Sequence, residues 1–229
     1  MELDANSPVP VREQTVNALR EAILSFELKP GQRLIEREFI ERLGISRTTF
    51  REAIREVAAE GLVTVVPQKG ARVSTPSFTE AVDLYEIRAC LESLAVMRFV
   101  ERASDEEISA LEEAIVDFSR VAHKTTDTLA LLNSKEMFYR VLIVGARSPV
   151  LEQLLAQMKA RVRGLRAASL SKPGRAFETV DELDAVVRAI RDRNAELAAN
   201  LCAEHVRTAA KIALRRLQDS VETDEVQYA

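Results

Sequence analysis

Three arginines, Arg47, Arg51 and Arg55, follow one another at intervals of four residues, and Thr48 and Thr49 lie between the first two. A guanidinium group presents a fork of N–H donors that matches O6 and N7 of guanine, and threonine hydroxyls suit phosphate oxygens. On an α-helix of about 3.6 residues per turn, a spacing of four drifts by only about 40° per step. One DNA groove could therefore receive at least the first two arginines, although isolated surface arginines are more often solvated helix charges.

Two short helices are needed to hold these side chains in place. Residues 36–43 put Phe39, Ile40 and Leu43 on one face, with the spacing of a short amphipathic helix. Gly44 ends this helix, and Ser46 is a good N-cap for a second one. The apolar residues that turn the second helix toward the core are Ala53, Ile54, Val57 and Ala58. This order predicts a helix-turn-helix, in which the first turns of the second helix meet the major groove.

The pattern changes to β-strands after Gly61. Residues 62–66 and 71–73 are rich in β-branched residues and are separated by the sequence Pro67-Gln68-Lys69-Gly70. Such a pair of runs with a glycine-containing tip predicts a β-hairpin. A hairpin that directly follows the two helices is expected to act as a wing.

Three segments carry a resemblance to a known family, namely residues 29–34 (KPGQRL), 46–53 (SRTTFREA) and 60–62 (EGL). With the order of helices and wing, they make residues 10–75 similar to the DNA-binding domain of the GntR family of bacterial transcription regulators. The resemblance implies that the wing tip, through Lys69 and Gly70, lies near the minor groove. The residues that it places at the DNA from the helix-turn-helix are Arg37, Ser46, Arg47, Thr48, Thr49 and Arg51.

Composition by itself does not point to DNA. The chain has 32 lysines and arginines against 36 aspartates and glutamates, and residues 1–76 carry 11 charges of each sign. Affinity would depend on local placement of arginines, doubled by dimerisation, and would fall steeply with added salt as counterions are released. The two cysteines, Cys90 and Cys202, lack a CxxC spacing, so neither a metal–thiolate site nor a disulfide framework is expected.

Length and hydropathy limit the number of domains and the location that we expect for the protein. The 229 residues suit two modest domains. The N-terminal residues lack the pattern of a targeting signal, and no segment has about 18 continuous apolar residues. We therefore expect a cytoplasmic protein without a membrane partner.

The second half is expected to be helical throughout. The periodicity predicts helices near residues 79–103, 105–122, 128–144, 149–170, 177–192 and 195–220. The fold class is therefore mainly α, with a winged helix-turn-helix and its small β-hairpin followed by an all-α bundle. The expected domains are a tail (1–9), the winged helix-turn-helix (10–75), a linker (76–78), the helical domain (79–221) and a second tail (222–229).

The helical half resembles the FCD effector domain, which follows the winged helix in the FadR subfamily of GntR regulators. The segments that carry this resemblance are residues 84–92, 138–142, 148–151 and 203–206. Many members hold a divalent metal through an Asp, a His four residues later and two further His. Here the matching positions carry Lys135, Tyr139, Leu183 and His205, so a single ligand remains. An ammonium group and a leucine cannot coordinate a cation, and we expect no metal and no cofactor.

A cationic pocket is the hypothesis for what replaces the metal. Arg88, Lys135 and His205 each share a stripe with leucines that point into the bundle. We expect Arg88, Lys135, Tyr139 and His205, with Arg161, to line a pocket for a small organic acid. Two alternatives stay open, because these charged groups could reach water or, for Arg88, be neutralised by Glu92 on the same helix.

The function expected from these features is that of a homodimeric regulator which binds double-stranded DNA. Two-fold protein symmetry is matched by an inverted-repeat operator, and the effector would bias the two DNA-binding domains. One alternative is a DNA-binding dimer whose pocket is degenerate. A helical enzyme is a remote alternative, because the sequence shows no nucleophile beside a base, no paired carboxylates and no phosphate-binding glycine loop.

Overall fold

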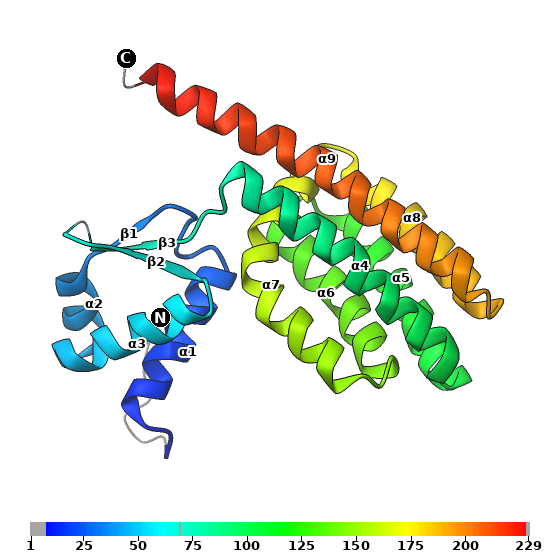
Figure 1. Ribbon diagram of the computed structural model, residues 1–229, viewed down its shortest axis with the longest axis horizontal. Coiled ribbons are helices and arrows are strands. Elements are labelled where there is room, and N and C mark those ends of the chain that lie inside the picture. The colour runs from blue at the N-terminus through cyan, green and yellow to red at the C-terminus, as the bar shows by residue number, and fades with distance from the viewer. Residues whose placement is uncertain (1–7, 69, 228–229) are drawn as a thin grey trace. The chain divides into compact units, whose positions relative to one another are not determined.

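A computed structural model describes residues 8–68 and 70–227 and divides into two compact units, Met1–Pro76 and Ser77–Ala229 (Figure 1). The elements of the first unit, in chain order, are α1 (Val11–Leu24), β1 (Arg33–Leu34), α2 (Glu36–Leu43), α3 (Arg47–Ala59), β2 (Val63–Val66) and β3 (Gly70–Val73). The predicted helix-turn-helix is confirmed, and α2 spans the residues expected for it.

Local chemistry explains the turn between α2 and α3. Gly44 adopts φ = 65°, a left-handed conformation that glycine enters without steric cost, and it ends α2. The Ser46 hydroxyl then accepts a hydrogen bond of 3.0 Å from the backbone N–H of Thr49 and caps α3. The rings of Phe39 and Phe50 stack 5.6 Å apart across the two helices. The turn therefore fixes the direction in which α3 leaves α2.

The wing is a three-stranded antiparallel sheet in the order β1-β3-β2. The hairpin of β2 and β3 was expected, and its register pairs Val63 with Val73 and Val65 with Ala71. The short strand β1 was not expected, and it pairs Arg33 with Arg72 on the other edge of β3. Two residues are too few to show an alternating pattern, so the sequence gives no signal for this strand.

The second unit is all α. Its helices are α4 (Phe78–Arg102), α5 (Asp105–Lys124), α6 (Thr128–Gly145), α7 (Pro149–Leu170), α8 (Arg175–Arg191) and α9 (Ala195–Gln227). All six were predicted. The largest difference is the end of α9, which was expected near residue 220, with a tail from residue 222. No Gly or Pro interrupts residues 220–227, so nothing in that segment stops the helix.

The helices of the second unit enclose an apolar core. α4 and α9 run side by side (Figure 1), and α4 also packs against α6, α7 and α8. Phe99 on α4 and Phe138 and Leu142 on α6 are fully buried in this core. Among the described residues, no helix is both long and apolar enough to cross a lipid bilayer.

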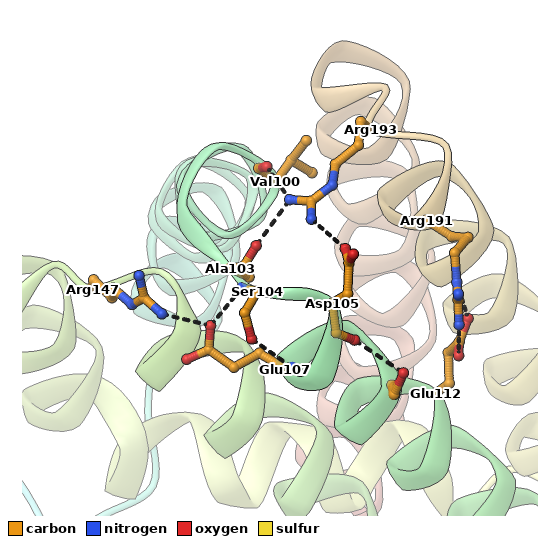
Figure 2. A network of polar contacts seen from close by, with 10 residues as sticks. Val100, Ala103, Ser104, Asp105, Glu107, Glu112, Arg147, Arg191 and Arg193 are labelled. Carbon is orange, nitrogen blue, oxygen red and sulfur yellow. Dashed lines mark hydrogen bonds and ion pairs between the residues drawn. The ribbon is translucent and has the colours of Figure 1, made fainter.

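Arginines join the helices at one end of this unit (Figure 2). Arg193 donates to the carbonyl oxygens of Val100 and Ala103, both at 2.9 Å, and to Asp105 at 2.8 Å. The last carbonyls of α4 have no partner within their own helix, and Arg193 satisfies two of them. Arg147 pairs with Glu107 in the same region. These contacts fix the turn between α4 and α5 against the connections that follow α6 and α8.

Candidate DNA interface and effector pocket

The start of α3 presents two guanidinium groups to solvent. The side chains of Arg47 and Arg51 are 74% and 59% exposed. Both lie beside the carboxylate of Glu36 at the start of α2, with Nε–Oε1 distances of 3.1 Å and 3.3 Å. Glu36 therefore holds the two arginines together on the surface of the helix-turn-helix.

The neighbouring predicted residues have different environments. Thr48 is exposed, whereas Thr49 is half-buried and its hydroxyl lies 2.8 Å from that of Ser46. Ser46 uses its hydroxyl to cap α3 and so fixes the N-terminus of this helix. The first backbone N–H groups of a helix have no partner within the helix and suit phosphate oxygens.

Arg37 and the wing tip complete the predicted DNA-binding set. Arg37 is highly exposed on α2 and lies 3.9 Å from Glu41. Gly70, at φ = 86°, begins β3, and Lys69 lies outside the described residues. Sequence reasoning missed Arg33 and Arg72, which β1 and β3 place opposite each other on the wing. Only the unexpected strand β1 brings these two cations together.

In the second unit, one buried carboxylate accepts hydrogen bonds from two arginines. Arg88 and Glu92 are 1% and 2% exposed, and Arg88 Nε donates to Glu92 Oε1 at 2.9 Å. Arg166 on α7 donates to the same oxygen at 2.8 Å. Burial opposes the charge on Glu92, but Arg88 and Arg166 outweigh it and lower its pKa to about 2. The expected alternative in which Glu92 neutralises Arg88 is present, with a second arginine added.

A second buried chain of contacts runs from α6 through α9 to α8. Lys135 Nζ lies 2.9 Å from His205 Nε2, and His205 Nδ1 lies 2.5 Å from Glu182. Glu182 also accepts two hydrogen bonds from Arg175, at 2.6 Å and 2.7 Å. Burial, followed by the charge of Lys135, lowers the His205 pKa to about 3. The imidazole is therefore neutral at pH 7, with Nδ1–H donating to Glu182 and Nε2 accepting from Lys135.

The Lys135 amine has a much lower pKa than a solvated lysine. Burial, and then the like charges of Arg166, Arg88 and Arg175, lower the pKa of Lys135 well below its usual value. An anion nearby would oppose both effects and favour the protonated form. Glu92 acts in this opposite direction on the pKa of Lys135 but does not outweigh the other effects.

A cavity of about 360 Å³ opens between α4, α6 and α7. Arg88, Glu92, Tyr139 and Arg166 line it, and the Arg166 guanidinium stacks 4.1 Å from the centre of the Tyr139 ring. Of the predicted effector residues, the structure brings Arg88 and Tyr139 to this cavity. Lys135 lies behind Tyr139, with Nζ 5.7 Å from the ring centre, beside a much smaller cavity.

The other predicted effector residues lie elsewhere. His205 contacts Lys135 but does not line the larger cavity, and Arg161 is partly exposed and pairs with Glu80 at 2.9 Å. Arg166, which sequence reasoning missed, follows Arg161 by five residues and so lies about 140° farther around α7. Which of the two arginines faces the cavity depends on how α7 packs against its neighbours. The sequence of α7 alone does not determine this.

Comparison with known proteins identifies both halves. Residues 11–73 match the family described as bacterial regulatory proteins, gntR family, and residues 83–208 match the FCD domain. The chain belongs to the GntR family. The combination of a GntR helix-turn-helix with an FCD domain is that of the FadR subfamily.

Curated relatives and solved structures that resemble this GntR-family protein support the same assignment. The HTH-type transcriptional regulator YdhC of Bacillus subtilis (strain 168) is 25% identical over 84% of this chain and 86% of its own. The Nta operon transcriptional regulator of Aminobacter aminovorans is 29% identical over 62% of this chain and 67% of its own. The structure of Escherichia coli McbR/YncC, at 23% identity, shares the fold with a TM-score of 0.71, covering 96% of this chain and 100% of that one. The protein is a transcriptional regulator and not an enzyme.

The residues of this GntR-family protein do not fit the metal that its subfamily often holds. Of the four matching positions, His205 alone carries a metal-binding side chain, and its Nε2 lone pair accepts from Lys135. Tyr139 is buried, and burial raises the pKa of its hydroxyl. Among the described residues, no group of three or more His, Cys, Asp and Glu side chains is placed to hold a metal ion.

Proposed function

We propose that this regulator binds an inverted-repeat operator as a homodimer, and that a small carboxylate bound in the FCD domain gates the binding. The observation that carries the DNA-binding part is the pair of exposed guanidinium groups, Arg47 and Arg51, at the start of α3. Residues at that place on a recognition helix reach base edges in the major groove.

An exposed apolar stripe on α4 supports the homodimer. Ile87, Leu94 and Met97 are all exposed, and their spacing of seven and three residues puts them on one face of the helix together with Cys90. The opposite face of α4 is buried in the core. A second copy of α4 would cover this stripe, because a two-fold interface joins the same surface of both subunits.

The charge of the cavity wall supports a carboxylate effector. At its inner part, two guanidinium groups, Arg88 and Arg166, share the one carboxylate of Glu92, which leaves an excess of one positive charge there. Of the other charged lining residues, Glu136 pairs with Arg163, and Arg140 and Glu152 are exposed. Buried charges are normally paired, so an anionic ligand would complete the set. Binding of this ligand would change the operator affinity, and DNA would change the ligand affinity by the same factor.

A second candidate function is a dimer that no small molecule gates. The internal pairing of Arg88 with Glu92 favours it, because the arginine already has a partner without a ligand. The two candidates differ in one measurement, which is operator affinity in the presence of a panel of organic acids. A change of threefold or more with any acid supports gating, and constant affinity supports the second candidate.

Selection of DNA from a random pool tests the DNA-binding proposal. We expect the full-length protein to select two inverted half-sites whose centres are one or more helical turns apart, at about 10 base pairs per turn. Two chains should bind each site. Selection of a single half-site by one chain would contradict the dimeric proposal.

A further inference from the structure

The inner wall of the FCD cavity carries donors without partners. Arg88 Nη1, Arg166 Nε and the Tyr139 hydroxyl are buried and have no hydrogen-bond partner among the described residues. All three residues line the cavity. A buried donor without a partner costs free energy, and a carboxylate is the acceptor that arginine and tyrosine bind most strongly.

The charge at this wall suits one negative charge. Arg88 and Arg166 carry two positive charges and Glu92 carries one negative charge, so a monoanion neutralises the group. A second carboxylate on the same ligand would find no further buried cation among the residues that line the cavity. The other charged lining residues do not change this count, because Glu136 pairs with Arg163, and Arg140 and Glu152 are exposed to solvent, where screening weakens their effect.

The rest of the cavity wall is mostly aliphatic. Leu142, Ile143, Leu155, Met158 and Val162 line it, and the described lining residues include no Ser, Thr, Asn or Gln. Glu136 and Glu152 also line it, but Glu136 pairs with Arg163 at 2.8 Å and Glu152 is exposed. A polyhydroxylated acid would therefore lose more hydrogen bonds to water than this part of the wall replaces, whereas an apolar group gains by leaving water. The volume of about 360 Å³ lies within the usual range of ligand pockets.

We propose that the effector is a monocarboxylic acid with an apolar body, which places its carboxylate at Arg88, Tyr139 and Arg166 and its body between α4, α6 and α7. This inference rests on the proposed gating function and names the ligand class for it. The inference predicts that apolar monocarboxylic acids bind, and that sugar acids, dicarboxylates and neutral amphiphiles do not.

Thermal unfolding of the full-length protein with five matched probes tests the ligand class. Octanoate and 3-phenylpropanoate are apolar monoacids, suberate adds a second carboxylate to the eight-carbon chain, gluconate adds hydroxyls, and 1-octanol lacks the charge. Octanoate, 3-phenylpropanoate or both should raise the unfolding temperature, and the other three probes should not. A larger shift with suberate, gluconate or 1-octanol, or no shift with either apolar monoacid, would overturn the inference.

Tyr139→Phe distinguishes specific binding from a general effect of amphiphiles. The replacement removes a hydroxyl that has no partner, so the unliganded protein should stay folded with its unfolding temperature kept or raised. The dissociation constant of the stabilising acid should rise about tenfold, because one hydrogen bond to its carboxylate is lost. Arg188→Ala, at an exposed site on α8 that does not line the cavity, is the control and should leave the dissociation constant unchanged. Equal affinities of the wild type and Tyr139→Phe would overturn the proposed position of the carboxylate.

The same probes keep this inference separate from the proposed gating. If an apolar monoacid binds but leaves operator affinity unchanged, the ligand class stands and the gating fails. If gluconate or suberate alters operator affinity while the apolar acids do not, the gating stands and the ligand class fails.

Discussion

At the scale of single residues, the buried charges of the FCD domain do not owe their presence to stability. Replacing buried ion pairs by apolar residues of similar size is often neutral or stabilising by about 1–4 kcal/mol. Glu92 nevertheless lies buried between Arg88 and Arg166, and Glu182 lies between Arg175 and His205. For Arg88, Glu92 and Arg166, which line the cavity, a requirement for a charged wall is a direct reason to keep these groups inside the bundle.

The neutral imidazole of His205 gives a prediction about pH. The unfolded chain protonates this residue below about pH 6.5, whereas the folded protein does so only near pH 3. The unfolded state therefore binds more protons between these values, and stability falls as the pH drops through 6.5. Between pH 7.5 and 5.5, His205 should account for a loss of about 1 kcal/mol in the free energy of unfolding.

Urea unfolding of the wild type and His205→Gln at the two pH values measures this loss. The variant should lose about 1 kcal/mol less than the wild type over the same interval. Glu182, with a pKa of about 2, stays ionised at both pH values and does not contribute to the difference. Equal losses in the two proteins would contradict a neutral His205.

At the scale of elements, two helical glycines differ in how closely neighbouring side chains approach them. Gly145 ends α6 against the buried ring of Phe99, and an added Cβ would lie 2.3 Å from that ring. Gly164, in the interior of α7, has no neighbour within 4 Å of such a Cβ. The same substitution should therefore have opposite effects at the two sites.

Gly145→Ala should lower the free energy of unfolding by about 1–3 kcal/mol, because Phe99 has to move within a filled core. Gly164→Ala should raise it by about 0.5–1 kcal/mol, because alanine favours the helix. Urea denaturation of both variants at pH 7.5 gives the comparison. A stable Gly145→Ala protein would show that α6 and α4 are packed less tightly than described.

Elements with strong local signals could be predicted from the sequence, and those that depend on tertiary pairing could not. Gly44 and Ser46 mark the ends of α2 and α3 by their own chemistry, so the helix-turn-helix was predicted closely. Strand β1 exists because of β3, and Arg166 reaches the cavity because of how α7 packs. Of the residues predicted for an effector pocket, Arg88 and Tyr139 line the cavity, whereas Arg161 pairs with Glu80 and does not line it.

At the scale of the whole molecule, the apolar stripe on α4 predicts the oligomeric state. Ile87→Asp combined with Leu94→Asp puts two charges per chain on the proposed interface and should convert the dimer to a monomer. The matched control is Val116→Asp with Val150→Asp, which changes two exposed valines on α5 and α7 and should leave the dimer intact. Sedimentation equilibrium distinguishes the outcomes, and a stripe variant that remains dimeric would place the interface elsewhere.

Dimerisation would also strengthen DNA binding. The N-terminal 76 residues have no net charge, so their overall charge does not attract DNA. Affinity must then come from a few well-placed arginines, and two copies of α3 double their number. A protein that binds in this way should lose affinity steeply as salt is added, by an amount that depends on how many phosphates it neutralises.

Operator affinity as a function of salt tests the central claim most directly. It is measured for the wild type, for Arg47→Ala/Arg51→Ala and for Arg120→Ala/Arg188→Ala. The last variant removes the same two charges from exposed sites on α5 and α8. We predict that the α3 variant binds operator at least tenfold more weakly and with a shallower salt dependence, because base and phosphate contacts are lost. The control should retain nearly wild-type values. Equal operator affinities for the wild type and the α3 variant would contradict the assignment of α3 as the helix that reads DNA.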